Sequence, residues 1–299
     1  MRDVLTELVS LLSLERLDTH RFRGQSQDLG WGQVFGGQVL GQALSAAHQT
    51  AGEGRHVHSL HGYFLRTGDT TTPVIYEVDP IRDGRSFTTR RVVALQAGRP
   101  IFTLAASFHV QEEGFHHQDE MPDVPGPDGV PSELELARLV AEHIPDGMRA
   151  RVLSDRPIEI RPLAPQNPFA PQPRPPRHQL WYRATGPLPD DPAIHRFLLA
   201  YASDFQFLVT ALRPHARSWV SRRMKVASLD HTMYFHRDFR MDDWLLYDIE
   251  SPWSGGARGL VRGRFFDRSG NLVATCHQEG LMRDRKLQHD AASAARGGP

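Results

Sequence analysis

The sequence predicts an α+β protein in which two tandem antiparallel sheets are each wrapped around a long helix. Three observations lead to this fold class. Similar strings of residues recur in the same order about 170 positions apart, each copy has one helical segment followed by several β-rich runs, and turn signals separate those runs. Strands joined by hairpins pair antiparallel, and a sheet with one helix buries its apolar face against that helix.

The repeat extends over roughly 50 residues of each half. The string "VHSLHGYFLR" from Val57 is similar to "VASLDHTMYFHR" from Val226, with two extra residues in the second copy. Turn signals at 97–98 and 269–270 each separate two β-rich runs, which is typical of a hairpin. Because the matches keep their order, we interpret the chain as a duplicated unit.

Each half is expected to begin with a short strand and then a helix. In the first half the strand begins at His20 and the helix at Gly36, where small residues would let the sheet approach closely. In the second half the strand begins at His178 and a single helix is expected over 192–212. An amphipathic helix is also expected close to the N-terminus, because leucines recur on one face there.

The composition changes along the chain and predicts four segments. These are a first unit over 1–115, a proline-rich linker with one helix over 116–177, a second unit over 178–287 and a disordered tail over 288–299. Within the linker, the string "SELE" carries a capping-box signal, with a serine followed three residues later by a glutamate. A short strand is expected at "RPIEIRP" from Arg156.

Charge and cysteine content exclude several classes of protein. The formal net charge is zero with no basic stripe, so a nucleic-acid partner is not expected. No apolar run reaches 18 residues, so no membrane span is expected, and without a signal peptide we expect a cytoplasmic protein. The single cysteine, Cys276, excludes a disulfide framework and is interpreted as packing rather than as a nucleophile.

The string "GGQ" at 36–38 has three possible meanings. It could cradle a phosphate, act as the Gly-Gly-Gln tripeptide of peptidyl-tRNA hydrolysis, or begin a closely packed helix. The first would need a following Lys-Ser or Lys-Thr, and the second a mobile loop in a basic protein. We therefore interpret Gly36 and Gly37 as a helix start, whose exposed N–H groups could also meet a ligand oxygen.

Several longer motifs occur in one order between Leu14 and Arg283. They include "FRGQSQDLGWGQVFGGQVLGQAL", "HSLHGYFLRTGD", "DGRSF", "MPDVPGPDGVPSE", "YASDFQFL", "SLDHTMYFHR" and "ARGLVRGRFFDRSGNLVATCHQEGLMR". This pattern resembles the acyl-CoA thioesterase II family, which has the double hotdog fold. The resemblance implies hydrolysis of fatty acyl-CoA to free acid and CoA, with no cofactor and no metal.

The resemblance also implies which residues are catalytic. In the family an aspartate, a threonine or serine, and a glutamine position a water, and the matching positions are Asp204, Ser228 and Gln278. The family often has threonine where this chain has Ser228, and either hydroxyl can donate and accept a hydrogen bond. A carboxylate can deprotonate water, and fixing that water removes entropy from the barrier.

The repeat suggests a single active site per chain. Aligned on the helices, Asp204 falls opposite Gly37, and Gln278 falls opposite Ala106. The first half therefore lacks the aspartate and the glutamine. Its Ser59, which matches the catalytic serine of the second half, is expected to have no catalytic partners.

Five residues are candidates for substrate binding. Gly36 and Gly37 could offer N–H groups. His58 could support the site from behind the residues that touch substrate, although a histidine in this setting is more often a hydrogen-bonded core residue. Arg85 and Arg258 lie in matching turns and could meet CoA phosphates, although arginines in turns are often only solvated.

Other functions remain open from the residues alone. An enoyl-thioester hydratase would need a paired His and Asp, and Asp230 and His231 are neighbours, but adjacent strand residues point to opposite faces. A non-catalytic acyl-CoA-binding protein is also possible, whereas a serine hydrolase would need a G-x-S-x-G elbow that the chain lacks. The expected partners are acyl-CoA and further copies of the chain, as a dimer or tetramer.

Overall fold

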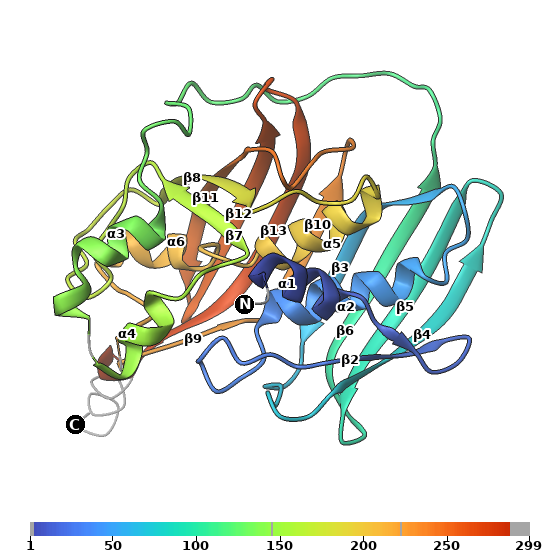
Figure 1. Ribbon diagram of the computed structural model, residues 1–299, viewed down its shortest axis with the longest axis horizontal. Helices are drawn as coiled ribbons and strands as arrows, with labels where there is room; N and C mark the ends of the chain where they lie inside the picture. Colours follow the sequence, from blue (N-terminus) through green and yellow to red (C-terminus); the bar gives the residue numbers. More distant parts are fainter. Residues whose placement is uncertain (1–2, 145, 222, 288–299) are drawn as a thin grey trace, which may run out of the picture.

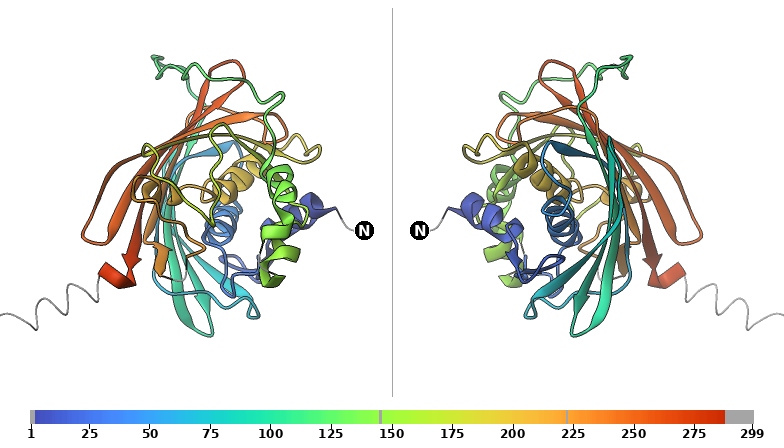
Figure 2. Two further views of the ribbon diagram at one scale, coloured as in Figure 1. Left: turned by 90° about the vertical axis from the view of Figure 1, so that its left-hand side faces the viewer. Right: turned by 90° about the vertical axis from the view of Figure 1, so that its right-hand side faces the viewer.

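The computed structural model describes residues 3–144, 146–221 and 223–287. The expected disordered tail, 288–299, lies outside the described residues. The strands form a broad, curved antiparallel sheet, and the helices α1, α2 and α5 lie on its concave side (Figures 1 and 2). Among the described residues, no helix is both long and apolar enough to cross a membrane.

The elements follow the order that the repeat predicts. The first part of the chain forms α1 (Val4–Leu12), β1 (Glu15–Arg16), β2 (Arg21–Gly24), α2 (Gly36–His48), β3 (Arg55–Phe64), β4 (Val74–Asp83), β5 (Phe87–Gln96) and β6 (Arg99–Val110). The middle forms α3 (Glu133–Leu139), η1 (Ala141–His143), α4 (Asp146–Val152) and β7 (Ile158–Pro162). The last part forms β8 (Arg177–Ala184), α5 (Pro192–Ala202), α6 (Val209–Leu212), η2 (Arg213–His215), β9 (Met224–Ser228), β10 (Asp230–Phe235), β11 (Leu245–Gly255), β12 (Arg258–Asp267) and β13 (Leu272–Asp284).

Every strand pair in the described chain is antiparallel, as predicted. The order is β1-β2-β4-β5-β6-β3-β10-β13-β12-β11-β8-β7, and β9 pairs with β13. The two sheets expected from the sequence are joined edge to edge, because β3 pairs with β10 with Leu60 opposite Met233. One strand from each half thus forms the seam of a continuous sheet.

The duplication is visible in how the matching strands are built. The first half has one long strand, β3, where the second half has β9 and β10 with Leu229 between them. This break lies where the sequence comparison requires two extra residues. The predicted hairpin turn at 97–98 is also confirmed, because Ala97 and Gly98 have left-handed φ values of 47° and 73°.

The helix of the second half differs from the prediction. The sequence predicted one helix over 192–212, but α5 ends at Ala202 and the chain then turns, with Gln206 at a left-handed φ of 59°, before the short α6 begins. Helix α5 lies along α2, and α6 packs against β11 and β12. The close approach of α2 and α5 favours glycine at position 41 of α2, since a Cβ there would lie 3.0 Å from the Phe197 carbonyl oxygen in α5.

The proline-rich middle segment contributes more than the expected linker with one helix. Its predicted capping box is present, because the N–H of Glu135 donates to Ser132 Oγ at 3.2 Å and the N–H of Ser132 donates to Glu135 Oε2 at 2.7 Å. A second helix, α4, was not predicted. The predicted short strand is confirmed as β7, which pairs with β8 at the edge of the sheet. In Figure 1 the green connection between β6 and α3 runs along the top of the sheet.

Candidate active site

The three predicted catalytic side chains meet at one place, although they come from three separate elements. Asp204 lies in the turn that follows α5, Ser228 is the last residue of β9, and Gln278 lies within β13. The Gln278 amide nitrogen donates to Ser228 Oγ at 2.6 Å, and Ser228 Oγ donates to Asp204 Oδ1 at 3.4 Å. The hydrogen bonds therefore run from the glutamine through the serine to the carboxylate.

Strand pairing explains why the serine and the glutamine are neighbours. Ser228 is paired with Gly280 across the β9–β13 ladder, and Gln278 is two residues from Gly280 on the same face of β13. Gly280 leaves room for Leu208, because a Cβ on this glycine would lie 2.1 Å from a Leu208 methyl carbon. The glycine thus lets the turn that carries Asp204 lie against the strand that carries Gln278.

The two glycines that begin α2 bring the first half of the chain to this carboxylate. The N–H of Gly37 donates to Asp204 Oδ2 at 3.0 Å. A Cβ on Gly36 would lie 2.7 Å from the same oxygen, and a Cβ on Gly37 would lie 2.2 Å from the Tyr201 carbonyl oxygen. Close packing at a helix start is therefore the reading that the geometry supports, and the Gly37 N–H meets Asp204 instead of the expected ligand oxygen.

Two further residues, His231 and Ser203, complete the cluster and were not predicted as members of the site. The His231 ring is fully buried, with Nδ1 2.7 Å from Gln278 Oε1 and Nε2 2.9 Å from Ser203 Oγ. Burial lowers the pKa of His231, while the charge of Asp204 opposes that shift. The sequence showed His231 only as a neighbour of Asp230, whose carboxylate accepts instead from the N–H of Glu279 at 2.6 Å.

The other candidate binding residues are not brought into contact with these side chains. His58 forms a 2.8 Å hydrogen bond with Ser107 Oγ, and burial lowers its pKa. Arg258 forms a 3.2 Å ion pair with Glu279, and Arg85 is exposed in the hairpin between β4 and β5.

Aromatic side chains form a wall beside Asp204. Phe35 and Phe205 stack with their ring centroids 4.4 Å apart, and each directly adjoins a site residue in the chain, Gly36 or Asp204. Trp31 lies 5.4 Å from Phe35, and Trp219 lies 6.2 Å from Trp31. Both tryptophans are partly exposed, so an apolar surface leads from solvent toward the carboxylate.

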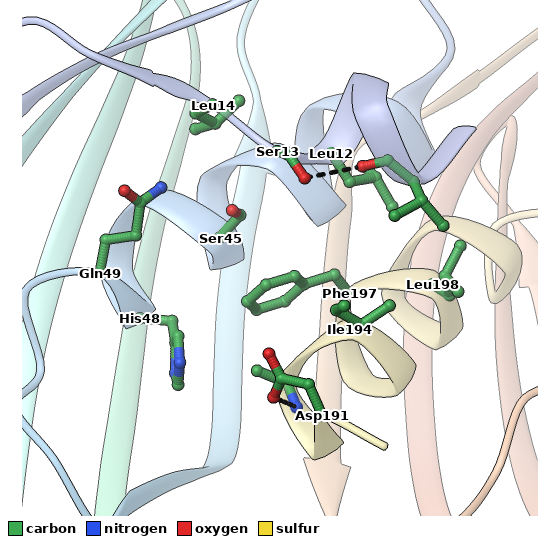
Figure 3. Close-up of a pocket in the computed structure, with 12 residues that line it drawn as sticks. Leu12, Ser13, Leu14, Ser45, His48, Gln49, Asp191, Ile194, Phe197 and Leu198 are labelled. Carbon is green, nitrogen blue, oxygen red and sulfur yellow. Dashed lines mark hydrogen bonds between the residues drawn. The ribbon is translucent and has the colours of Figure 1, made fainter. Parts of the chain in front are cut away.

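A pocket of about 300 Å³ lies at the other end of the helix pair (Figure 3). Its wall includes Ser45 and His48 from the last turn of α2, together with Asp191, which caps the start of α5, and Phe197 from the middle of α5. Ser45 and His48 follow Gly37 by 8 and 11 residues, which places them about 12 to 17 Å along the helix. Since none of the three predicted catalytic residues lines it, this pocket is separate from the site.

Neither a metal cluster nor a reactive thiol is found in the described part of the chain. No group of three or more His, Cys, Asp or Glu side chains within it could hold a metal ion. Cys276 is fully buried with its Sγ 3.2 Å from the Tyr247 hydroxyl, and burial raises the pKa of the thiol to about 12. The cysteine is therefore protonated at neutral pH and is a packing residue, as predicted.

Comparisons with known proteins show which family the chain is similar to. Residues 148–281 match the family described as acyl-CoA thioesterase, and residues 26–109 match the family described as acyl-CoA thioesterase N-terminal domain. The chain is 44% identical to acyl-CoA thioesterase 2 of Haemophilus influenzae, over 95% of this chain and 99% of that one. It is 42% identical to human acyl-coenzyme A thioesterase 8, over 95% and 90% of the two chains.

Solved structures give the same picture of the fold. The crystal structure of an acyl-CoA thioesterase II from Mycobacterium marinum is 41% identical and superimposes with a TM-score of 0.76, covering 93% of this chain and 98% of that one. A hotdog-fold protein from Alicyclobacillus acidocaldarius, 21% identical, has a TM-score of 0.75 with coverage of 93% and 98% and supports the fold alone. The chain therefore belongs to the acyl-CoA thioesterase II family and has the double hotdog fold.

Proposed function

We propose that this enzyme hydrolyses fatty acyl-CoA to free acid and CoA with a water that is positioned by Asp204, Ser228 and Gln278. Membership of the family supports thioester hydrolysis as the reaction. The observation that carries the residue assignment is the pair of hydrogen bonds, 2.6 Å and 3.4 Å, that joins the three side chains. The Asp204 carboxylate can act as a general base, and Ser228 and Gln278 beside it are two groups that can orient a water.

Each group has a distinct part in this mechanism. Asp204 accepts a proton from the water as the water oxygen attacks the thioester carbonyl carbon. Gln278 has a second amide hydrogen beyond the one given to Ser228, and this hydrogen and the serine oxygen hold the water in place. The tetrahedral intermediate then collapses, the C–S bond breaks, and the sulfur leaves with the electron pair and takes up a proton.

A single-turnover reaction in ¹⁸O-labelled water, with enzyme in excess, tests the direct attack of water. If water attacks the thioester, the label appears in the fatty acid after one turnover and Asp204 stays unlabelled. If Asp204 attacks first and forms an anhydride, water can cleave it at the aspartyl carbon, and mass spectrometry would then find the label in the peptide that contains Asp204. That second result would contradict the proposal.

Substitution of the carboxylate tests the same assignment by kinetics. Asp204→Asn keeps the size and an acceptor oxygen for Gly37, so the protein should fold while kcat falls roughly 10²- to 10⁴-fold. Asp79→Asn is the matched control, because Asp79 forms only an exposed ion pair with Arg91 on the sheet surface. An Asp204→Asn enzyme that releases CoA at the normal rate would rule out Asp204 as the base.

The hydratase alternative has a simple test. Crotonyl-CoA should not be hydrated, because Asp230 and His231 have different partners and do not face one substrate. Hydration without release of CoA would favour that alternative, and tight binding of palmitoyl-CoA without thiol release would favour a binding protein.

We further propose a division of the chain into units, an oligomeric state and a cellular location. The units 1–115 and 178–287 are proposed to be the two hotdog halves, joined by 116–177. A homo-oligomeric state is proposed as a dimer or tetramer, which analytical ultracentrifugation would measure. A cytoplasmic location is the third.

A further inference from the structure

His231 lies directly behind Gln278 and is sealed from solvent by the core. Its ring contacts Gln278 Oε1 through Nδ1 at 2.7 Å and Ser203 Oγ through Nε2 at 2.9 Å. We propose that His231 is a positioning residue that, with its hydrogen on Nδ1, holds Gln278 Oε1 and so keeps the amide nitrogen of Gln278 facing Ser228. The inference rests on the proposed role of Gln278 in holding the water.

The hydrogen-bond donors and acceptors define the direction of the chain of contacts. An amide oxygen can only accept, so His231 Nδ1 carries the hydrogen that it gives to Gln278 Oε1. In the neutral ring Nε2 is then an acceptor, and the Ser203 hydroxyl donates to it. The opposite end of the amide, Nε2 of Gln278, consequently faces Ser228 as a donor.

The reverse orientation of the amide would disable the site without breaking the core. With the amide turned over, its NH₂ would donate to Nδ1 of the other His231 tautomer, whose Nε2–H would donate to Ser203 Oγ. Ser203 would still be satisfied, because its hydroxyl also lies 2.9 Å from the Ala200 carbonyl oxygen. The Ser228 hydroxyl, however, would donate to the amide oxygen instead of Asp204, and no amide hydrogen would be left for the water.

Burial increases the difference in free energy between the two orientations of the Gln278 amide. Gln278 is only 1% exposed and His231 is 0% exposed, so an amide end that loses its partner in this place also has no access to bulk water. The two orientations therefore depend on the protein partners alone. The His231 tautomer with its hydrogen on Nδ1 goes with the active orientation, so a residue at 231 that donates at this position should hold the amide in that orientation.

Two variants of His231 separate positioning from packing. His231→Phe keeps a ring of similar size and removes both nitrogens, so kcat should fall roughly 10- to 100-fold through loss of orientation while KM changes less than about threefold. His231→Asn places its amide nitrogen the same number of bonds from the backbone as Nδ1 and should restore most of kcat. Both are measured with decanoyl-CoA and thiol detection, with circular dichroism as the check on folding.

A double-mutant cycle with Gln278→Ala gives the decisive measurement. If His231 acts through Gln278, adding His231→Phe to Gln278→Ala should lower kcat by less than about twofold, whereas independent effects would multiply. Multiplying effects, or a fully active His231→Phe enzyme beside an impaired Gln278→Ala enzyme, would overturn the inference. A fully active Gln278→Ala enzyme would instead contradict the proposed catalytic site itself.

A second pair of variants keeps the question answerable if His231→Phe does not fold. His231→Gln is as polar as His231→Asn, but it carries its amide one bond further out, beyond the position of Nδ1. We expect the Asn variant to be active and the Gln variant to be impaired in kcat. Equal activity of the two would show that a donor at this position does not matter.

Discussion

The backbone N–H of Gly37, in the first half of the chain, donates a 3.0 Å hydrogen bond to the Asp204 carboxylate in the second half. This bond leaves the other carboxylate oxygen, Oδ1, for Ser228. The first half thus has no aspartate at the matching position, yet it helps to hold the aspartate of the second half. The first half therefore contributes a backbone contact to the carboxylate that we propose as the general base.

The Gly37–Asp204 contact predicts that Gly37→Ala lowers stability. An alanine in the first turn of a helix normally favours the helix by about 1 kcal/mol relative to glycine. At Gly37, however, the new Cβ would lie 2.2 Å from the Tyr201 carbonyl oxygen, which is backbone and cannot move aside freely. We expect the free energy of unfolding in urea to fall by about 1 to 3 kcal/mol, with kcat reduced as well.

Gly147 provides the matched control for this prediction. It also lies in the first turn of a helix, α4, and a Cβ there would meet no heavy atom within 4 Å. Gly147→Ala should therefore leave stability unchanged or raise it by up to about 1 kcal/mol. Equal effects of the two substitutions would show that close packing is not what requires glycine at position 37.

Cys276 is predicted to be dispensable for turnover. Its pKa of about 12 keeps the thiol protonated, and its contacts are with Tyr247 and the Gly263 carbonyl oxygen inside the core. The Cys276→Ser enzyme should keep its activity within about threefold, because a serine hydroxyl can form the same hydrogen bonds. Iodoacetamide should not inactivate the native enzyme. Rapid inactivation, or a roughly hundredfold loss in the serine variant, would identify the thiol as a catalytic group.

Local features of the fold could be predicted because nearby residues determine them. The hairpin at 97–98 follows from residues that adopt left-handed conformations, and the capping box of Ser132 and Glu135 lies within four residues of sequence. The antiparallel sheet followed from repeated β-rich runs joined by such turns. In each case the interaction that forms the structure lies within the motif that predicts it.

The break between α5 and α6 could not be predicted in the same way. The helical pattern continues through 203–208, but Gln206 adopts a left-handed conformation and its side-chain amide donates to Glu133 Oε1 at 2.6 Å. Glu133 lies 73 residues earlier, in the segment that was expected to be a linker. A contact between residues so far apart in the sequence can override the local preference for helix, and the hydrophobic pattern of the sequence does not reveal such a contact.

The proposed catalytic group was predicted from the family resemblance and not from the residues taken alone. Asp204, Ser228 and Gln278 are separated by 24 and 50 residues, and each is an ordinary turn or strand residue when taken alone. His231 escaped notice because its partner is Gln278, 47 residues away in the neighbouring strand. The alternation of side chains along a strand correctly placed His231 and Asp230 on opposite faces, but it could not show which residue the buried His231 ring would contact.

Asp242 is predicted to make stability depend on acid pH. The Arg240 guanidinium and the N–H of Leu188 hydrogen-bond its carboxylate, and they lower the pKa of Asp242 from 3.8 to about 2. A lowered pKa in the folded state stabilises the fold fully above the unfolded value of 3.8 and progressively less as the pH falls toward 2. Because the ion pair lies near the surface and is screened by solvent, the contribution at neutral pH should be about 1 kcal/mol or less.

Urea unfolding of the wild type and of Asp242→Asn between pH 3 and 7 measures this contribution. The difference in the free energy of unfolding should be constant above about pH 5 and should shrink below pH 4. A difference that stays constant across the whole range would show that the ionised carboxylate is not what stabilises the fold.

The duplication supplies the sharpest test of a single active site, because both halves carry a matching serine. Ser228→Ala should lower kcat roughly 10- to 100-fold, since it removes the hydroxyl between Gln278 and Asp204. Ser228→Thr should keep kcat within a few-fold, because the hydroxyl remains and family members often carry threonine there. Steady-state kinetics on each variant measures both effects.

Ser59→Ala is the control that the fold itself provides. Ser59 lies on β3 opposite Ser107, and Gly37 and Ala106 stand where the second half has its aspartate and glutamine. Neither can act as a base or hold a water through a side chain, so Ser59→Ala should change kcat by less than about twofold, as expected for a residue outside the catalytic group. If Ser59→Ala in a folded protein were as damaging as Ser228→Ala, the first half would itself take part in the chemistry. The single-site interpretation of the duplication would then be wrong.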